Sequence, residues 1–332
     1  MRAVRFHEYG EGVDVFQVDE IDRPEPRHDE VLVEISASSV NPADTYMVAG
    51  SYAPPDLPWV PGIDFAGTVV EVGDRVGTPD AAGQVNDFEV GDRVFGTGIA
   101  KYVPGGYQEY AAVPASRVAH LPGNMDLVTA GGVGCAAVTA WLCLVEFGNL
   151  GVSDQCLIHG ASGGVGHTAV QIADAAGAHV IATAAPKYQN RVSELGADVV
   201  LDYDRPDLVE AIVEASGGGV DVILDHRLDE YLDLDAEVAN MHAHVLGIGE
   251  AAMDPSVTIS QSSAARLKDL SVKFMKMFNT PDLQTPLERI AGMIERDEFT
   301  LEVAREYSFE DAGDAHRDTM EDSYFGKLVV TP

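Results

Sequence analysis

The chain has 332 residues, 46% of them hydrophobic, which is enough for two ordinary domains with large cores. No run of about 18 apolar residues occurs, and residues 1–10 lack the apolar core of a signal peptide. We therefore expect a cytoplasmic protein without a membrane span. Acidic residues number 54 against 21 basic ones, which gives a formal net charge of −33.

The acidic residues are scattered along the chain and do not form a tail. The electrostatic field of such a protein repels nucleic acid, so we expect no nucleic-acid partner. The hydrophobic content is too high for a disordered acidic protein. Molar salt shortens the Debye length to about 3 Å, which screens the self-repulsion of an acidic surface. The composition thus indicates a protein from the cytoplasm of a halophile. We expect its fold to lose stability at low salt.

Residues 1 to about 120 have the pattern of a β-rich region. β-branched residues are concentrated in 31–37 and 65–73, and turn signals such as Asn-Pro and Pro-Gly separate these stretches. The sequence Gly-Asp-Arg-Val occurs at 73–76 and again at 91–94. We interpret the two copies as the starts of two strands, with a surface loop over residues 77–88 between them.

The pattern changes from about residue 125, where a helical stretch rich in small residues runs to residue 147. Short apolar strands then alternate with helices, which predicts a parallel sheet covered on both faces. The expected strands are 155–160, 179–184, 199–203, 221–226, 244–249 and 271–278. The remaining residues return to the mixed pattern, with amphipathic helices at 287–299 and 309–322 and a final strand at 326–331.

A glycine-rich turn, IHGASGGVGHTAV at 158–170, lies between a predicted strand and a predicted helix. In that context Gly160 permits a sharp turn, and Gly163 and Gly164 let a pyrophosphate approach the backbone N–H groups. Gly166 lets the helix pack against the strand, and the N-terminus of the helix attracts the anion. The turn therefore predicts a dinucleotide site, with an unliganded tight turn as the alternative.

The second strand of this series indicates which dinucleotide binds. An NAD site usually has an acid at the end of that strand, about 20 residues after the glycines, which binds the ribose hydroxyls. Here the strand ends in Thr183 with no acid in reach, and Lys187, one of only six lysines, follows. These features favour the 2′-phosphate of NADPH. The alternative is that Lys187 is an ordinary solvated side chain.

In their order along the chain, the motifs resemble those of the medium-chain dehydrogenase/reductase superfamily. More narrowly, they resemble its zinc-independent quinone oxidoreductases, the zeta-crystallin group. The matching stretches span nearly the whole chain: SSVNPADTYMVAGSY (38–52), PGIDFAGTVVEVGD (61–74), GDRVFG (91–96), GGYQEYAAV (105–113), HGASGGVG (159–166) and AHRDTMEDSYFGKLVV (315–330).

The resemblance implies an α/β fold made of two domains. A GroES-like β-rich catalytic domain is formed by residues 1–123 and 267–332, and a Rossmann doubly wound parallel sheet that binds NADP is formed by residues 124–266. It also implies transfer of a hydride or electrons from NADPH to a quinone or an activated alkene in a cleft between the domains.

The resemblance further implies which residues form the site. Asn41, Asp44, Tyr46 and Tyr52 are expected to line the substrate pocket. A tyrosine there polarises the acceptor carbonyl or, as we favour, packs against a flat substrate. The residues expected to contact the cofactor are Ser162, Gly163, Gly164, Val165, Thr183, Lys187, Tyr203, Arg227, Gly247, Ile248, Gly249 and Lys327.

The zinc-binding relatives give a contrast. They have a cysteine where this chain has Asn41, and a Gly-His-Glu motif where it has Gly62-Ile63-Asp64. Ile63 cannot bind a metal, and Cys135, which matches their third ligand, is left without the others. Residues 95–113 also lack the four cysteines of their structural zinc site. We therefore expect no metal, and we expect Cys135, Cys143 and Cys156 to be buried thiols.

Two short stretches depart from the zeta-crystallin pattern. Asp225-His226-Arg227 replaces a small, glycine-containing turn, and His242-Ala243-His244 replaces a Gly-Gly-Arg sequence. We hypothesise that Arg227 helps to neutralise the 2′-phosphate, and a surface ion pair with a nearby acid is the alternative. We expect structural roles for His226, His242 and His244, because the sequence gives no evidence of a chemical function for them.

Three functions stay open at this point. The first is a quinone reductase, and the second is an ene reductase acting on an enone or an acryloyl thioester, for whose coenzyme A tail few basic residues are present. The third is a structural or RNA-binding role like that of some zeta-crystallin relatives, against which the charge of −33 argues. The stretch 271–278 is expected to form an exposed edge strand of the Rossmann sheet, and the resemblance implies a homodimer, because relatives pair such edges across a two-fold axis.

Overall fold

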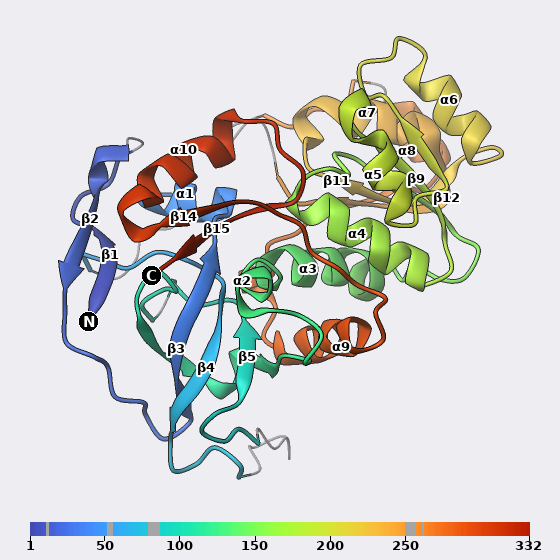
Figure 1. Cartoon of the computed structure of the whole chain (residues 1–332). Helices are drawn as coiled ribbons and strands as arrows, with labels where there is room; N and C mark the ends of the chain where they lie inside the picture. Colours follow the sequence, from blue (N-terminus) through green and yellow to red (C-terminus); the bar gives the residue numbers. More distant parts are fainter. Residues whose placement is uncertain (11–12, 52–55, 79–86, 102, 250–255, 261) are drawn as a thin grey trace. The chain divides into compact units, whose positions relative to one another are not determined.

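The computed structural model describes residues 1–332 except 11–12, 52–55, 79–86, 102, 250–255 and 261. The chain divides into two compact units, which we call the first unit (Met1–Val138 with Thr280–Pro332) and the second unit (Thr139–Asn279). Both chain ends belong to the first unit (Figure 1). The predicted boundaries, before residues 124 and 267, differ from this division. Tyr52 and most of the predicted loop at 77–88 lie outside the described residues.

A seven-stranded sheet forms the first unit, with strand order β14-β15-β3-β4-β5-β7 and with β6 pairing with β3. Only β14 and β15 pair in parallel, and a separate antiparallel pair is formed by β1 and β2. The strands are β1 (Arg2–Phe6), β2 (Phe16–Glu20), β3 (Glu30–Ser39), β4 (Phe65–Val72), β5 (Arg93–Gly96), β6 (Tyr110–Pro114), β7 (Val118–His120), β14 (Val303–Ser308) and β15 (Lys327–Thr331).

Short helices accompany this sheet, and an apolar cluster that includes Val31, Val33, Phe65 and Val69 forms its core. The β15 strand pairs with β3, so residues from both ends of the chain meet in this unit. The helices are η1 (Val13–Val15), α1 (Pro42–Val48), η2 (Ala115–Arg117), α2 (Leu127–Ala130), α9 (Gln284–Glu295), η6 (Phe309–Asp311) and α10 (Ala312–Glu321).

The second unit contains a six-stranded parallel sheet in the order β10-β9-β8-β11-β12-β13. Its strands are β8 (Gln155–Ile158), β9 (His179–Thr183), β10 (Val199–Leu201), β11 (Val220–Asp225), β12 (Ala239–Gly247) and β13 (Ser271–Phe274). Numbered within the unit, this order is 3-2-1-4-5-6, that of a Rossmann fold. Its strand order reverses between β8 and β11, and ligands of such sheets bind at this reversal, beside the carboxyl ends of the strands.

Helices connect these strands, and the core of the unit is apolar. Leu157, Ile181, Ile223 and Val245 come from four neighbouring strands and are fully buried, as expected for parallel strands covered on both faces. The helices are η3 (Leu142–Phe147, a π-helix), α4 (Gly164–Ala175), η4 (Pro186–Tyr188), α5 (Gln189–Glu194), α6 (Leu208–Ala215), α7 (Leu228–Val238), α8 (Ser262–Leu267) and η5 (Met277–Asn279).

The predicted fold class is confirmed, with local corrections. The expected helix at 125–147 is broken into α2, α3 (Gly134–Trp141) and η3. At Gly131 a side chain would meet Ala37 Cβ at 2.6 Å, so the chain approaches β3 too closely there for any other residue. The strand predicted at 271–278 ends at Phe274, and β13 pairs with β12 in the parallel sheet of the second unit.

His242 and His244, the two histidines of β12, have backbone roles in the sheet. His242 adopts a left-handed conformation with φ of 65°, a backbone region that glycine adopts more readily than other residues. Its backbone N–H donates to the Lys268 carbonyl. His244 lies in register with Ser271 of β13. Cys143 and Cys156 are buried as predicted, whereas the prediction for Cys135 is wrong, because this residue is only half-buried. All three cysteines are free of disulfides.

Candidate active site

The glycine turn follows β8 at the carboxyl edge of the parallel sheet. Gly160 has φ of +63°, and a side chain there would meet the His226 ring at 2.6 Å. At Gly166 an added Cβ would collide with the carbonyl oxygen of Gly160. Both positions therefore require glycine, the first for backbone conformation and the second for close packing of α4 against the turn.

The N-terminus of α4 is open to an anion. Gly163 is its N-cap and offers no side chain to the first N–H groups of the helix. Ser162, Gly163, Gly164 and Val165 are half-buried, whereas the helix residues from Gly166 to Ala173 are buried. Uncapped N–H groups and a positive helix end suit a pyrophosphate, so the residues present fit the predicted cofactor.

Thr183 supports this turn from the neighbouring strand. Its hydroxyl accepts a hydrogen bond from Gly160 N at 3.2 Å, and its carbonyl accepts one from Ala161 N at 2.9 Å. The side chain is buried, with 1% of its surface exposed. The structure thus gives Thr183, predicted as a cofactor residue, a role in holding the turn.

The region after β9, where a 2′-phosphate site is predicted, carries an exposed positive charge. Lys187 is exposed on η4, and its ammonium lies 4.6 Å from the centre of the Tyr188 ring. Among the described residues it forms no ion pair with a carboxylate, although the chain carries 54 acidic residues. Tyr203, after β10, is 39% exposed. An exposed lysine without an acidic partner can bind a phosphate without first breaking an ion pair.

Arg227 forms ion pairs with nearby acids, which is the alternative that the sequence left open. Arg227 is the N-cap of α7, and its guanidinium pairs with Glu230 and lies 3.8 Å from Asp229, both in the first turn of that helix. A contact with the 2′-phosphate would compete with these two acids, and the contact stays a hypothesis.

The end of β12 adjoins the turn after β11. Ile248 N donates to the Asp225 carbonyl at 2.9 Å. A side chain at Gly247 would collide with Leu228, and one at Gly249 would meet the His226 carbonyl at 3.1 Å. The segment Gly247–Gly249 is therefore held close to the carboxyl end of β11, beside the reversal point of the sheet.

The first unit holds a buried polar network around Asn41, at the start of α1. Asn41 Nδ2 donates to Asp64 at 3.0 Å and to Asp44 at 3.1 Å, and Ser39 Oγ also donates to Asp64, at 2.5 Å. Lys327 Nζ donates to Asn41 Oδ1 at 2.6 Å and to the Val40 carbonyl at 2.8 Å. We call these five side chains, Ser39, Asn41, Asp44, Asp64 and Lys327, the Asn41 network.

Asp44 differs from its predicted role as a pocket residue. It is fully buried, and its Oδ1 accepts from Gly62 N at 3.2 Å and Ile63 N at 2.9 Å, while its Oδ2 accepts from Asn41 N at 3.0 Å. With both oxygens used internally, Asp44 fixes the backbone on either side of the site instead of touching a substrate. Burial, with repulsion from Asp64, raises the pKa of Asp44 to about 7.

Lys327 supplies the positive charge of the network. Burial lowers the pKa of its ammonium, and the nearby Asp64 opposes that shift. Its hydrogen bonds to the Val40 carbonyl and to Asn41 Oδ1 both lie within the first unit. The structure thus makes Lys327 an internal partner of Asn41, and its direct contact with a cofactor stays a prediction.

The residues at the zinc-ligand positions do not fit a metal. Asn41 and Asp64 hydrogen-bond to each other, and Asp64 Oδ1 accepts from the backbone N–H of Cys135 at 2.6 Å. Ile63 is apolar and fully buried. Across the described ranges of the chain, no group of three or more His, Cys, Asp or Glu side chains is arranged to hold a metal ion. Tyr46, which lies on α1 as Asp44 does, is half-buried.

Comparisons with known proteins agree with this architecture. A family model described as alcohol dehydrogenase GroES-like domain matches residues 27–123, and one described as zinc-binding dehydrogenase matches residues 195–330. The chain is 31% identical over 340 residues to the quinone oxidoreductase of Lama guanicoe, which covers 99% of this chain and 97% of that protein. The chain belongs to the medium-chain dehydrogenase/reductase family. The prediction of an oxidoreductase enzyme is thereby confirmed.

Solved structures of this medium-chain dehydrogenase/reductase fold cover the whole chain. The Escherichia coli quinone oxidoreductase complexed with NADPH superposes with a TM-score of 0.86 at 26% identity, covering 100% of both chains. An NAD-dependent alcohol dehydrogenase superposes with a TM-score of 0.89, also at 26% identity and 100% coverage of both chains. Structural similarity alone therefore does not distinguish an NADPH site from an NAD site. The residues after β9 are needed for that distinction.

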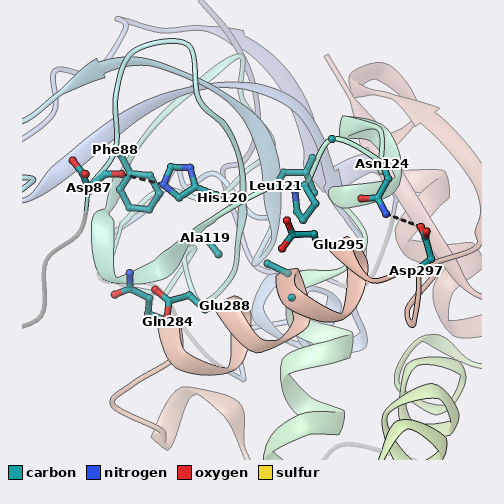
Figure 2. A pocket seen from close by; sticks show the side chains of 14 residues that line it. Asp87, Phe88, Ala119, His120, Leu121, Asn124, Gln284, Glu288, Glu295 and Asp297 are labelled. Atoms are coloured by element: carbon teal, nitrogen blue, oxygen red, sulfur yellow. Dashed lines mark hydrogen bonds between the residues drawn. The ribbon is translucent and has the colours of Figure 1, made fainter.

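A separate pocket of about 760 Å³ lies in the first unit, between α9 and the chain around β7 (Figure 2). Its walls include four carboxylates, Asp87, Glu288, Glu295 and Asp297, and none of the predicted site residues lines it. Four acids repel a dinucleotide phosphate, so this pocket does not suit the cofactor.

The sequence interpretation missed one group of polar residues, Asp225 and Asp235, which are both fully buried in the second unit. A signal was present, because Leu228, Leu232 and Asp235 occupy one buried face of α7 at helical spacing. An acid on an apolar helix face indicates a buried partner.

Among the described residues, no helix is long and apolar enough to span a membrane.

Proposed function

We propose that this protein is a zinc-independent, NADPH-dependent quinone oxidoreductase. The observation that carries the choice of cofactor is the exposed Lys187, which follows β9 where an NAD site has an acid, and which no described carboxylate neutralises. The quinone oxidoreductases among the relatives, at 31% identity over nearly the full chain, support the class of acceptor.

Each unit contributes a distinct part of the proposed mechanism. The second unit binds the pyrophosphate at the N-terminus of α4 and the 2′-phosphate beside Lys187. When bound, NADPH supplies the hydride or electrons, which the protein directs by orienting the nicotinamide against the acceptor. A quinone takes its proton from water or from a nearby hydroxyl, so no buried general acid is needed.

The Asn41 network favours a positioning role in the first unit. Asn41 uses Oδ1 for Lys327 and Nδ2 for Asp44 and Asp64, so its amide is oriented by three charged groups. We propose that this network fixes the wall of the acceptor site and that Tyr46 packs against the flat ring of the quinone. Zinc plays no part in the proposed reaction, because the amide, the apolar Ile63 and the saturated Asp64 carboxylate do not form a ligand set.

The test follows oxidation of NADPH and of NADH in concentrated KCl, with a benzoquinone or with a simple enone as acceptor, with and without a chelator. Turnover of NADPH with the quinone, unchanged by the chelator, is expected. Turnover with the enone alone would instead support the ene-reductase alternative.

We also propose that the protein is a homodimer that works in the cytoplasm of a halophile. All four residues of β13 are exposed at the edge of the parallel sheet, including Val272 (38%) and Phe274 (61%). Met241 and Leu267 add exposed apolar surface in the same unit. An unpaired edge with apolar side chains favours pairing with a second copy, and the charge of −33 favours high salt over a nucleic-acid partner.

A further inference from the structure

Three strand ends converge behind the glycine turn, at the point where the order of the parallel sheet reverses. His159 follows β8, Thr183 ends β9, and Asp225 ends β11. Asp235, on α7, faces the same place, and all four side chains are buried with at most 2% of their surface exposed. Buried polar side chains at this edge of a Rossmann sheet lie next to the ligand position, and the mechanism above does not use them.

Hydrogen bonds connect the turn to Asp235 in a single direction. Gly160 N donates to Thr183 Oγ1 at 3.2 Å, and this hydroxyl lies 3.3 Å from His159 Nδ1. His159 Nε2 in turn lies 3.0 Å from Asp235 Oδ1. Because the Thr183 oxygen accepts from Gly160, its own proton is free to be donated to Nδ1, which leaves the imidazole proton on Nε2 for Asp235.

The imidazole is held as a neutral ring. Burial lowers the pKa of His159 to about 4. The Tyr231 ring stacks on it at 4.6 Å between ring centres, with an angle of 13° between the planes. His159 therefore has one donor and one acceptor in fixed directions, as the chain of hydrogen bonds requires.

Asp225 ends β11, and Asp235 lies on α7, which packs against β11, so that the two buried carboxyl groups interact with each other. Oδ1 of Asp225 accepts from Arg227 N at 2.6 Å, but Oδ2 of each residue has no donor among the described groups. None of the described lysines or arginines forms an ion pair with either carboxyl group. Two buried acceptor atoms without a donor are costly, and one proton shared between them satisfies both.

We propose that Asp225 and Asp235 share one proton and act, through His159 and Thr183, as positioning residues that hold the Gly160 turn in its pyrophosphate-binding conformation. This inference rests on the proposed function, because it assumes that the turn binds NADPH. The shared proton couples cofactor affinity to pH: loss of the proton places a second negative charge behind the turn and removes the bond between β11 and α7.

The direction of the pH effect follows from the surroundings of the pair. Burial raises the pKa of Asp235, and burial followed by repulsion from Asp235 raises that of Asp225. The proton is therefore present at lower pH, and NADPH affinity is expected to fall as the pH rises toward 9. The titratable and charged groups that face the pair or its neighbours are His159, Tyr203, His226, Arg227, Asp229, Glu230 and Tyr231.

The experiment measures the Kd of NADPH from pH 6.5 to 9 in concentrated KCl, by the change in nicotinamide fluorescence on binding. The proteins are the wild type, Asp235→Asn, Asp235→Leu and the control Asp233→Asn, which removes a carboxylate of the same helix that binds Ser260 instead. Thermal unfolding of each protein shows that it is folded. The 2′-phosphate titrates near pH 6 in every case, so the comparison is between proteins.

We expect Asp235→Asn to bind NADPH with nearly constant affinity over this range, because its amide donates to Asp225 and accepts from His159 at every pH. Asp235→Leu is expected to raise Kd and the KM for NADPH on the order of tenfold, with kcat and the quinone KM within about twofold of the wild type. The control is expected to follow the wild type.

Parallel pH profiles in the wild type and Asp235→Asn would overturn the positioning role and leave the proposed function intact, as would an unchanged Kd in a folded Asp235→Leu. Failure of the wild type to bind NADPH at any pH would overturn both.

Discussion

Lys327 Nζ lies 2.6 Å from Asn41 Oδ1, although the two residues are 286 positions apart in the chain. The contact joins β15, at the C-terminal end of the chain, to the start of α1. It places a buried ammonium near two buried carboxylates, Asp44 and Asp64. An internal cation thus belongs to the Asn41 network.

Removal of this cation is expected to destabilise the first unit. Lys327→Met keeps most of the volume of the side chain but leaves Asp44 and Asp64 without a buried positive charge. The expected loss is about 3 kcal/mol in the free energy of unfolding at pH 8, measured by urea denaturation in concentrated KCl. A loss below about 0.5 kcal/mol, the size typical of surface substitutions, would contradict this role.

The same variant has a predicted pH dependence. The folded-state pKa of Asp44, about 7, lies above the usual value of about 4, so the stability it contributes is complete below pH 4 and is lost as the pH rises through 7. Without Lys327, which favours the ionised form, this loss grows. The difference in unfolding free energy between wild type and Lys327→Met is therefore expected to shrink as the pH falls from 8 to 5.5. A constant difference would mean that Asp44 does not titrate in this range.

Lys187 is expected to set the preference for NADPH. Lys187→Ala removes the cation that we propose binds the 2′-phosphate, so the KM for NADPH should rise on the order of tenfold while the KM for NADH stays unchanged. Lys187→Arg should retain most of the preference. Arg296→Ala, which removes an exposed cation paired with Glu298 in the first unit, is the matched control for net charge. Equal effects of Lys187→Ala on the two cofactors would show that Lys187 does not contact the phosphate.

The edge strand β13 is expected to form the dimer interface. Phe274→Glu puts a charge on the exposed edge and should convert the dimer to a monomer in light scattering after gel filtration. Val152→Glu makes the same change at a residue that is 78% exposed elsewhere in the second unit, and it should leave the dimer intact. A wild type that is monomeric in concentrated KCl would rule out this interface.

Stability is expected to depend strongly on salt. With a net charge of −33, dilution of KCl from about 3 M to 0.1 M lengthens the Debye length from below 3 Å to about 10 Å and restores self-repulsion. The urea concentration at the unfolding midpoint should fall with dilution. Sucrose at matched osmolality is the control, because it is preferentially excluded from the protein surface but does not screen charge. Equal protection by sucrose and KCl would contradict an electrostatic cause.

Local patterns along the chain were enough to predict the parallel sheet and the glycine turn, because each depends on residues close in sequence. The role of Lys187 stays a prediction. The partners of Lys327 and the burial of Asp44 could not be predicted in this way. They depend on the pairing of β15 with β3, which joins the two ends of the chain, and no local pattern determines that register. The pair Asp225 and Asp235 lies between these cases, since the apolar face of α7 marks Asp235 but does not name its partner.

The most direct test of the account compares initial rates of NADPH and NADH oxidation with 1,4-benzoquinone in concentrated KCl, before and after treatment with a chelator. A strong preference for NADPH and no loss of rate with the chelator are expected. A preference for NADH, or a rate that the chelator abolishes and zinc restores, would contradict it.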